Sequence, residues 1–209
     1  MIDKISDGLY RLRVPFEDIT TSVYFFLNDK GAVIIDSATY PSDADEYIIP
    51  AMNELGISVK DVKVLALTHI HSDHAGGIER LSYLIPNAKV MAPFEMNVPN
   101  FLRIMDQDMF LDELMAIRLP GHSKNSVGYL DIRTNTLLSG DCLQLLGIGK
   151  YRDGIAYPEL YISSVKRLKC MDIKRIVAAH EYDPLGSVAE GESEVENYLN
   201  MCIDIASEL

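Results

Sequence analysis

Three histidines and one aspartate fall within six positions of the stretch THIHSDHAGG, directly after the apolar run VKVLAL. They form the pattern His69-x-His71-x-Asp73-His74. The apolar run predicts a buried strand, and the residues after it predict a helix. Side chains two positions apart at a strand end point the same way. We therefore expect a fold in which a strand end and a helix start present these ligands to one cavity.

Three further candidate ligands occur later in the chain, each after an apolar stretch. They are His122 in LPGHS, Asp141 in LLSGDCL and His180 in IVAAHE. A ligand at the end of a strand is held by a rigid scaffold and still opens to a cleft lined by loops. Taken singly, each would be read as a structural histidine or a turn aspartate. Together with the first string they use all five histidines, and histidine with carboxylate is a ligand set for zinc, iron or manganese.

The other patterns predict an α/β chain with two β-rich blocks. Residues 28–31 predict a turn, and Pro50 is a candidate interruption of the first helix. Residues 93–113 predict a loop with a short helix, which is either a lid over a substrate or an irregular part of the core. We expect strands at 9–14, 22–28, 32–36, 62–68, 88–92, 114–119, 127–132, 136–139 and 175–180, and helices at 41–56, 74–85, 158–171 and 188–209.

Length and charge narrow the function classes. A chain of 209 residues with 48% hydrophobic residues predicts a single domain over residues 1–209. The net charge of −12 argues against nucleic acid as a partner. The N-terminal residues do not resemble a signal peptide and no apolar run reaches about 18 residues, so no membrane partner and a cytoplasmic location are expected. Cys142, Cys170 and Cys202 are too widely spaced for a disulfide framework or a thiolate zinc site and are expected to be buried thiols.

The ligand motifs resemble those of the metallo-β-lactamase superfamily, in the family's order, from the N-terminal hairpin to His180. The resemblance implies an αβ/βα four-layer sandwich and two bound metal ions. It also implies that VIIDSA is an early strand ending in Asp36, which would support the site or simply make a turn. By the same resemblance, one metal is held by His69, His71 and His122, the second by Asp73, His74 and His180, and Asp141 bridges the two.

One departure bears on the substrate. The best-known lactamases of this superfamily carry Cys where Asp141 stands, whereas here Cys142 follows that position. Neighbours in an extended segment point to opposite faces, so Cys142 should point away from the metals. Hydrolysis of β-lactam antibiotics is therefore disfavoured. The sequence AAHE around His180 also departs from the small-Gly-His form that is common in the family.

The expected cofactors are two divalent metal ions, with zinc preferred and iron or manganese as alternatives. Metal binding lowers the pKa of water from about 15.7 towards 7, which yields hydroxide at neutral pH. Either Asp73 or Asp141 would orient this nucleophile and accept its proton, in a subsidiary role. The leading hypothesis is a hydrolase of an activated acyl bond, a thioester or lactone, of a small molecule.

The substrate is less constrained than the reaction. The 39 positions from Asp141 to His180 are similar to the spacing in the hydroxyacylglutathione hydrolase branch, but none of the 29 residues after His180 is basic. Glutathione itself is thus disfavoured. Lactonases resembling this family place a tyrosine near the substrate carbonyl, and the candidates here, each with core or rim packing as the alternative, are Tyr151, Tyr157, Tyr161 and Tyr182.

Other functions share the same ligands. Sulfur dioxygenases resembling this fold bind one iron with these motifs, so an iron-dependent oxidoreductase is the second hypothesis. A phosphodiesterase acting on a small molecule is the third. The sequence does not indicate an oligomeric state.

Overall fold

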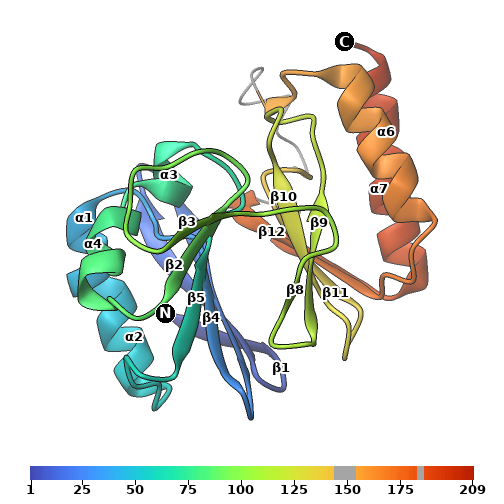
Figure 1. Ribbon diagram of the computed structural model, residues 1–209. Coiled ribbons are helices and arrows are strands. Elements are labelled where there is room, and N and C mark those ends of the chain that lie inside the picture. Colours follow the sequence, from blue (N-terminus) through green and yellow to red (C-terminus); the bar gives the residue numbers. More distant parts are fainter. Residues whose placement is uncertain (144–153, 183–185) are drawn as a thin grey trace. The chain divides into compact units, whose positions relative to one another are not determined.

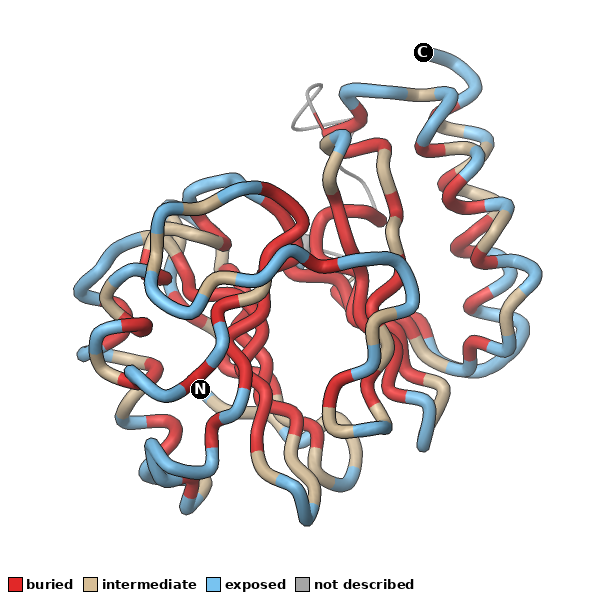
Figure 2. The backbone as a smooth tube through the Cα atoms, viewed as in Figure 1, coloured by how far each residue is buried: buried red, intermediate tan, exposed pale blue. Residues whose placement is uncertain are grey.

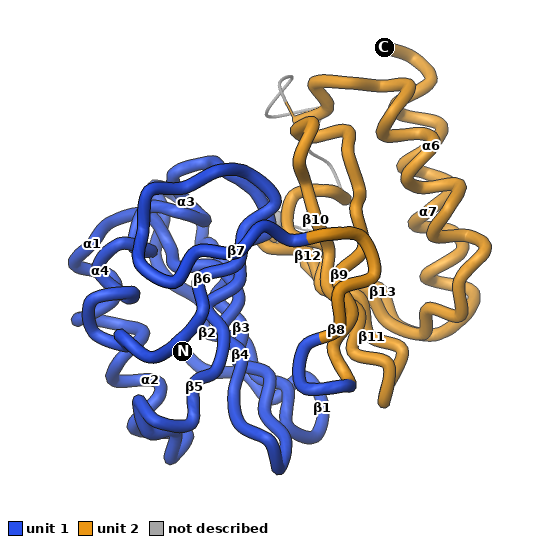
Figure 3. Tube along the Cα trace, in the orientation of Figure 1, with its two compact units in different colours: residues 1–104, 110–112 blue, residues 105–109, 113–209 orange. Residues whose placement is uncertain are grey.

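The structure is a computed structural model that describes residues 1–143, 154–182 and 186–209. The chain divides into two compact units, residues 1–104 with 110–112, and residues 105–109 with 113–209 (Figure 3). Each unit is built around one sheet with helices packed on it (Figure 1). Buried positions concentrate along the strands of both units (Figure 2). The expectation of a single domain stays a prediction.

Within the described residues, the first unit contains a seven-stranded sheet whose strands lie in chain order. Strands β1 to β4 are antiparallel, and β4 to β7 are parallel. The predicted turn at 28–31 is confirmed, since β3 and β4 pair from Asn28 and Gly31 onward. The strands are β1 (Ile2–Ser6), β2 (Leu9–Phe16), β3 (Ile19–Asn28), β4 (Gly31–Ile35), β5 (Val62–Ala66), β6 (Lys89–Ala92) and β7 (Phe101–Arg103).

The helices of this unit are shorter than predicted. The segment expected as one helix over 41–56 contains a π-helical turn, and Pro50 lies in the first turn of the helix after it, where a missing N–H is tolerated. The helix expected over 74–85 begins earlier, at Ser72, and is interrupted at a Gly-Gly pair. The helical segments are α1 (Pro41–Asp43), η1 (Ala44–Ile48), α2 (Ile49–Glu54), α3 (Ser72–Ala75) and α4 (Ile78–Leu84).

The Gly-Gly pair marks a close approach between two backbone segments. A Cβ on Gly76 would lie 1.8 Å from the carbonyl oxygen of Thr39, and a Cβ on Gly77 would lie 2.2 Å from that of Ser37. Neither glycine has a positive φ, so contact rather than conformation requires them. The segment after β4 thus lies directly against the end of α3, the helix that carries Asp73 and His74.

Substituting Gly76→Ala should destabilise the protein by about 3 kcal/mol, the upper part of the range for overpacked sites, because a carbonyl oxygen cannot move aside as a side chain can. Gly56→Ala is the matched control. Its added methyl meets nothing within 4 Å, and its φ of +71° costs about 1 kcal/mol. Urea denaturation measures both changes. Equal destabilisation by the two substitutions would contradict the close approach.

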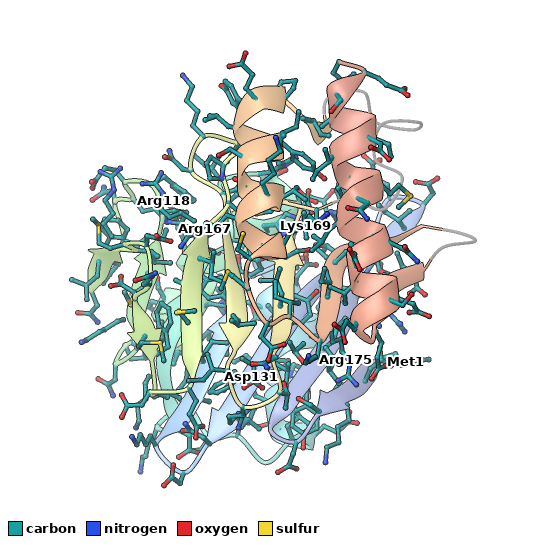
Figure 4. All side chains as sticks on the ribbon, turned by 90° about the vertical axis from the view of Figure 1, so that its right-hand side faces the viewer. Met1, Arg118, Asp131, Arg167, Lys169 and Arg175 are labelled. Carbon is teal, nitrogen blue, oxygen red and sulfur yellow. The ribbon has the colours of Figure 1, made fainter. Side chains whose placement is uncertain are left out.

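Within the described residues, the second unit contains a six-stranded sheet in the order β13-β12-β11-β10-β9-β8. Strands β11 and β12 are parallel, whereas β9 with β10, β10 with β11, and β12 with β13 are antiparallel. Helices α6 and α7 pack along one another on one face of the sheet (Figure 4). The elements are β8 (Met109–Phe110), β9 (Leu114–Arg118), β10 (Val127–Asp131), β11 (Thr136–Gly140), α6 (Pro158–Lys169), β12 (Arg175–Tyr182), β13 (Gly186–Glu190) and α7 (Glu192–Ser207).

Two predictions for this part of the chain are wrong. Residues 93–113 are mostly loop, as expected, but they contain the short strands β7 and β8 in place of the expected short helix, because sheet pairing decides the structure of such short segments. The last helix begins at Glu192, not at residue 188, because residues 186–190 form β13 against β12. That strand alternates buried and exposed positions, which is the period of a strand.

Candidate metal centre

In the first unit, the candidate ligands follow the carboxyl end of a parallel strand pair. Strands β4 and β5 are in register at Ile35 and Ala66, so the residues after them leave the sheet side by side. Thr68 N–H and Thr68 Oγ1 both donate to Asp36, with distances of 2.8 Å to Oδ1 and 2.8 Å to Oδ2. Asp36 is buried and has a φ of +64°, a backbone strain of the kind found at functional sites. Of the two interpretations of Asp36, the structure supports the one that makes it a support for the site.

His74 is held at two points by the segment after β4. Its Nδ1 lies 2.8 Å from Asp36 Oδ2, and its carbonyl oxygen accepts hydrogen bonds from Ser37 N–H at 2.7 Å and Ser37 Oγ at 2.9 Å. The imidazole is completely buried. Its position is therefore determined before any ligand binds.

The same contacts assign the tautomers of two histidines. Thr68 Oγ1 has one proton, which goes to the Asp36 carboxylate, so the hydroxyl accepts from His69 Nδ1–H at 3.0 Å. Asp36 likewise accepts from His74 Nδ1–H. Both rings thus present an unprotonated Nε2, the form that binds metal. The rings of His69 and His74 lie 4.2 Å apart, and those of His69 and the exposed His71 lie 4.6 Å apart, between centroids.

In the second unit, Asp141 lies between two histidines. Its Oδ2 is 3.5 Å from His122 Nε2, and its Oδ1 is 3.3 Å from His180 Nε2. Asp141 follows β11, and β12 carries His180 on the neighbouring parallel strand, with Gly140 in register with Ala178. His122 Nδ1 donates to the carbonyl oxygen of Gly154 at 2.8 Å, so this ring also presents an unprotonated Nε2. All three side chains are buried.

The donor atoms fit a divalent metal ion. In each unit an imidazole Nε2 faces a carboxylate oxygen: His74 faces Asp73 Oδ2 at 3.3 Å, and His122 faces Asp141 Oδ2 at 3.5 Å. A cation between the two atoms would satisfy both of them. Two ligands bound to one tetrahedral zinc ion at about 2.1 Å lie about 3.4 Å apart. Each unit therefore has a His and Asp pair whose separation suits two ligands of one metal ion.

Tyr24 is a buried tyrosine close enough to Asp36 and His74 for both to act on its phenol. Burial raises the pKa of Tyr24 to about 12, against the opposing influence of the Arg11 guanidinium. Arg11 and Tyr24 are cross-strand neighbours on β2 and β3, and both Asp36 and His74 also act on the phenol. The phenol stays neutral at physiological pH and adds a polar group where a charge would be costly.

The four candidate substrate-binding tyrosines have different surroundings. Tyr157 is 37% exposed, just before α6, whereas Tyr161 is only 1% exposed. Tyr161 packs beneath Gly121, whose added Cβ would lie 2.6 Å from the Cβ of Tyr161. The structure thus does not support Tyr161 as a substrate contact and makes it a support for the loop of His122. Tyr151 and the side chain of Tyr182 lie outside the described residues.

The structure adds residues that sequence reasoning missed. Thr21 Oγ1 donates to the carbonyl oxygen of Asp73 at 3.0 Å and ties β3 to the ligand helix. Thr68, Ser37 and Gly154 position the ligand histidines, as described above. Only Thr68 had a signal in the sequence, its place directly before His69. Cys142 is buried in the apolar core of the second unit, among residues such as Ile117 and Leu143.

Comparison with known families places most of this chain in one group. The family model of the metallo-beta-lactamase superfamily matches residues 17–180. Among curated proteins, the uncharacterized protein YobT of Bacillus subtilis (strain 168) is 28% identical over 59% of this chain and 62% of its own length. The hydroxyacylglutathione hydrolase of Vibrio campbellii is 27% identical over 74% of this chain and 59% of its own length. This chain spans about three fifths of the length of these curated relatives.

Solved structures confirm the predicted fold class. A metallo-beta-lactamase from Erythrobacter litoralis has a TM-score of 0.77 at 18% identity, covering 100% of this chain and 96% of that one. A metallo-beta-lactamase family protein of Thermus thermophilus has a TM-score of 0.75 at 19% identity, covering 98% of this chain and 81% of that one. These likenesses show the fold, an αβ/βα sandwich of the metallo-β-lactamase type. In the described part of the chain, no helix is long and apolar enough to cross a membrane.

Proposed function

Because this chain belongs to the metallo-β-lactamase superfamily, we propose that it is a dinuclear metal hydrolase that cleaves a thioester or lactone bond of a small molecule. The Asp141 carboxylate carries the proposal, since its two oxygens face two different histidines, at 3.5 and 3.3 Å. One carboxylate between two histidines suits a ligand that bridges two ions. His122 would belong to one ion and His180 to the other.

In this proposal the ligands of the first unit complete both sites. His69 and His71 join His122, Asp73 and His74 join His180, and the family's order of ligands supports this division. Zinc is the proposed metal, since the proposed donors are five imidazoles, three of which present Nε2, and two carboxylates. When bound, the metals would supply a nucleophile from water at neutral pH and polarise the scissile carbonyl.

The residues of this chain perform the remaining steps. Asp73 is the more accessible carboxylate, with 12% of its side chain exposed against 7% for Asp141. Asp73 would orient the attacking water and accept its proton. The Asp36 and Thr68 pair would keep the imidazoles of His69 and His74 in place as charge develops. Preorganised dipoles of this kind need no rearrangement during the reaction.

Hydroxyacylglutathione hydrolases among the relatives support the acyl-bond part of the proposal, since a hydroxyacylglutathione is a thioester. A cytoplasmic location and a small-molecule substrate belong to the same proposal. The acidic net charge of −12 supports a substrate other than a nucleic acid.

Metal analysis followed by a substrate panel tests the proposal. Protein purified without added metal should contain about two zinc ions per chain by elemental analysis. The same protein should hydrolyse thioesters or lactones and leave β-lactams intact. Activity confined to phosphodiesters would contradict the acyl-bond assignment. One or two irons with oxygen consumption on thiol or persulfide substrates would replace the hydrolase with the oxidoreductase.

A further inference from the structure

An exposed cation lies close in sequence to one of the candidate ligands. Lys124 stands two positions after His122, in the loop between β9 and β10, and its side chain is exposed. The ammonium group lies over the ring of Tyr157, 5.3 Å from the ring centroid. This cation–π contact orients a side chain that is otherwise free to rotate.

The two segments that carry Lys124 and Tyr157 are joined around His122. The imidazole Nδ1 donates to Gly154 O at 2.8 Å, and the N–H of Tyr157 donates to Gly121 O at 2.9 Å. A third contact, from Ser164 Oγ to Pro120 O at 2.7 Å, ties the same loop to α6. Lys124 is therefore mounted on backbone that is fixed relative to the candidate ligand.

Among the described residues of the second unit, most other cations have a hydrogen-bonding or ion-pair partner. Figure 4 shows Arg118 and Arg167 close together. The Arg167 guanidinium donates to both carboxylate oxygens of Asp106, at 3.0 and 2.9 Å. It also donates to the carbonyl oxygen of Arg118 at 3.3 Å. Arg133, Lys174 and Arg175 form ion pairs with Asp131, Asp172 and Glu190. Among the residues that the structure describes, no carboxylate pairs with Lys124.

We propose that Lys124, held over Tyr157, binds an anionic group of the substrate beside the metal ligand His122. The inference rests on the proposed function and narrows its substrate class to acyl compounds that carry a negative charge near the scissile bond. A lysine is suited to this task because its ammonium is a compact charge with three donors.

Two thioesters that differ by one charge test the subsite. S-acetyl mercaptoacetate carries a carboxylate, and S-acetyl mercaptoacetamide has a neutral amide in its place. The metal-loaded wild-type protein should have a KM about tenfold lower for the acid, the scale of one charge-assisted hydrogen bond. Lys124→Gln should remove this preference, and Lys124→Arg should restore most of it. Tyr157→Leu should reduce it, since the ammonium loses its support.

Binding supplies a readout that does not depend on turnover. Titration calorimetry of mercaptoacetate and mercaptoacetamide, which share the thiol, should show the same tenfold preference and its loss in Lys124→Gln. Lys166→Gln is the matched control, because Lys166 is also exposed and its removal changes the net charge equally. It stands nine residues beyond Tyr157, about 13 Å along α6. This control should retain the preference.

The outcomes separate the subsite from the proposed function. Equal binding of the two thiols, or equal loss in Lys124→Gln and Lys166→Gln, would overturn the subsite whether or not the thioesters are hydrolysed. A carboxylate preference that depends on Lys124 in a protein that hydrolyses neither thioester would uphold the subsite and count against the thioesterase function.

Discussion

Asp141→Ala should reduce the bound metal from about two ions per chain to about one or fewer and lower kcat/KM at least about 10³-fold, the scale on which central electrostatic groups act. The reason is geometric, because Asp141 faces both His122 and His180 and no second carboxylate of that unit occupies the gap among the described residues. Elemental analysis gives the metal content, and steady-state kinetics on a hydrolysed thioester or lactone gives the loss of activity.

Cys142→Ala is the matched control for Asp141→Ala. The thiol is the next residue in the chain, but it is buried in the apolar core of the second unit. Its loss should leave metal content and turnover unchanged and should affect only stability. Loss of metal in Cys142→Ala with retention in Asp141→Ala would reverse the ligand assignment.

Asp36→Ala should weaken metal binding by about 10- to 100-fold, the usual effect of removing a group that orients a ligand. The substitution frees His74 Nδ1 and removes the acceptor of Thr68, so the tautomers and orientations of two imidazoles are lost together. Competition with a chromophoric chelator measures the affinity without reference to activity.

Asp43→Ala separates this effect from a general loss of structure. The Asp43 carboxylate is also buried in the segment after β4, where it accepts from the N–H groups of Thr39 and Tyr40 at 3.0 and 2.8 Å. Its removal should cost about 1 kcal/mol of stability as a lost helix cap and leave metal affinity unchanged. Similar losses of affinity in both variants would show that Asp36 acts through the fold alone.

The candidate site was accessible from the sequence because ligand chemistry is local. Four ligands lie within six positions, and each later ligand follows an apolar stretch that becomes or adjoins a strand. The spacing of His69 and His71 predicted rings on one side, and their centroids lie 4.6 Å apart. Asp141 faces two histidines, His122 and His180. Its place beside His180 results from the parallel pairing of β11 with β12, and no local sequence pattern specifies that pairing.

The errors arose where long-range pairing decides the structure. Strand β1 carries no strong apolar run, and its residues become a strand because they pair with β2. Strands β7, β8 and β13 are short, so sheet contacts outweigh local preference. Tyr161 illustrates the same limit for a side chain, since the glycine that it supports lies 40 positions earlier in the sequence.

The two-point attachment of His74 has a consequence for metal exchange. A side chain whose ring and carbonyl are both held loses little rotational entropy on binding an ion, so the apo protein already has the geometry of the bound state at this ligand. A rigid ligand of this kind cannot adapt to the coordination preference of each metal. The site should then favour ions whose preferred coordination matches the fixed position of this ligand.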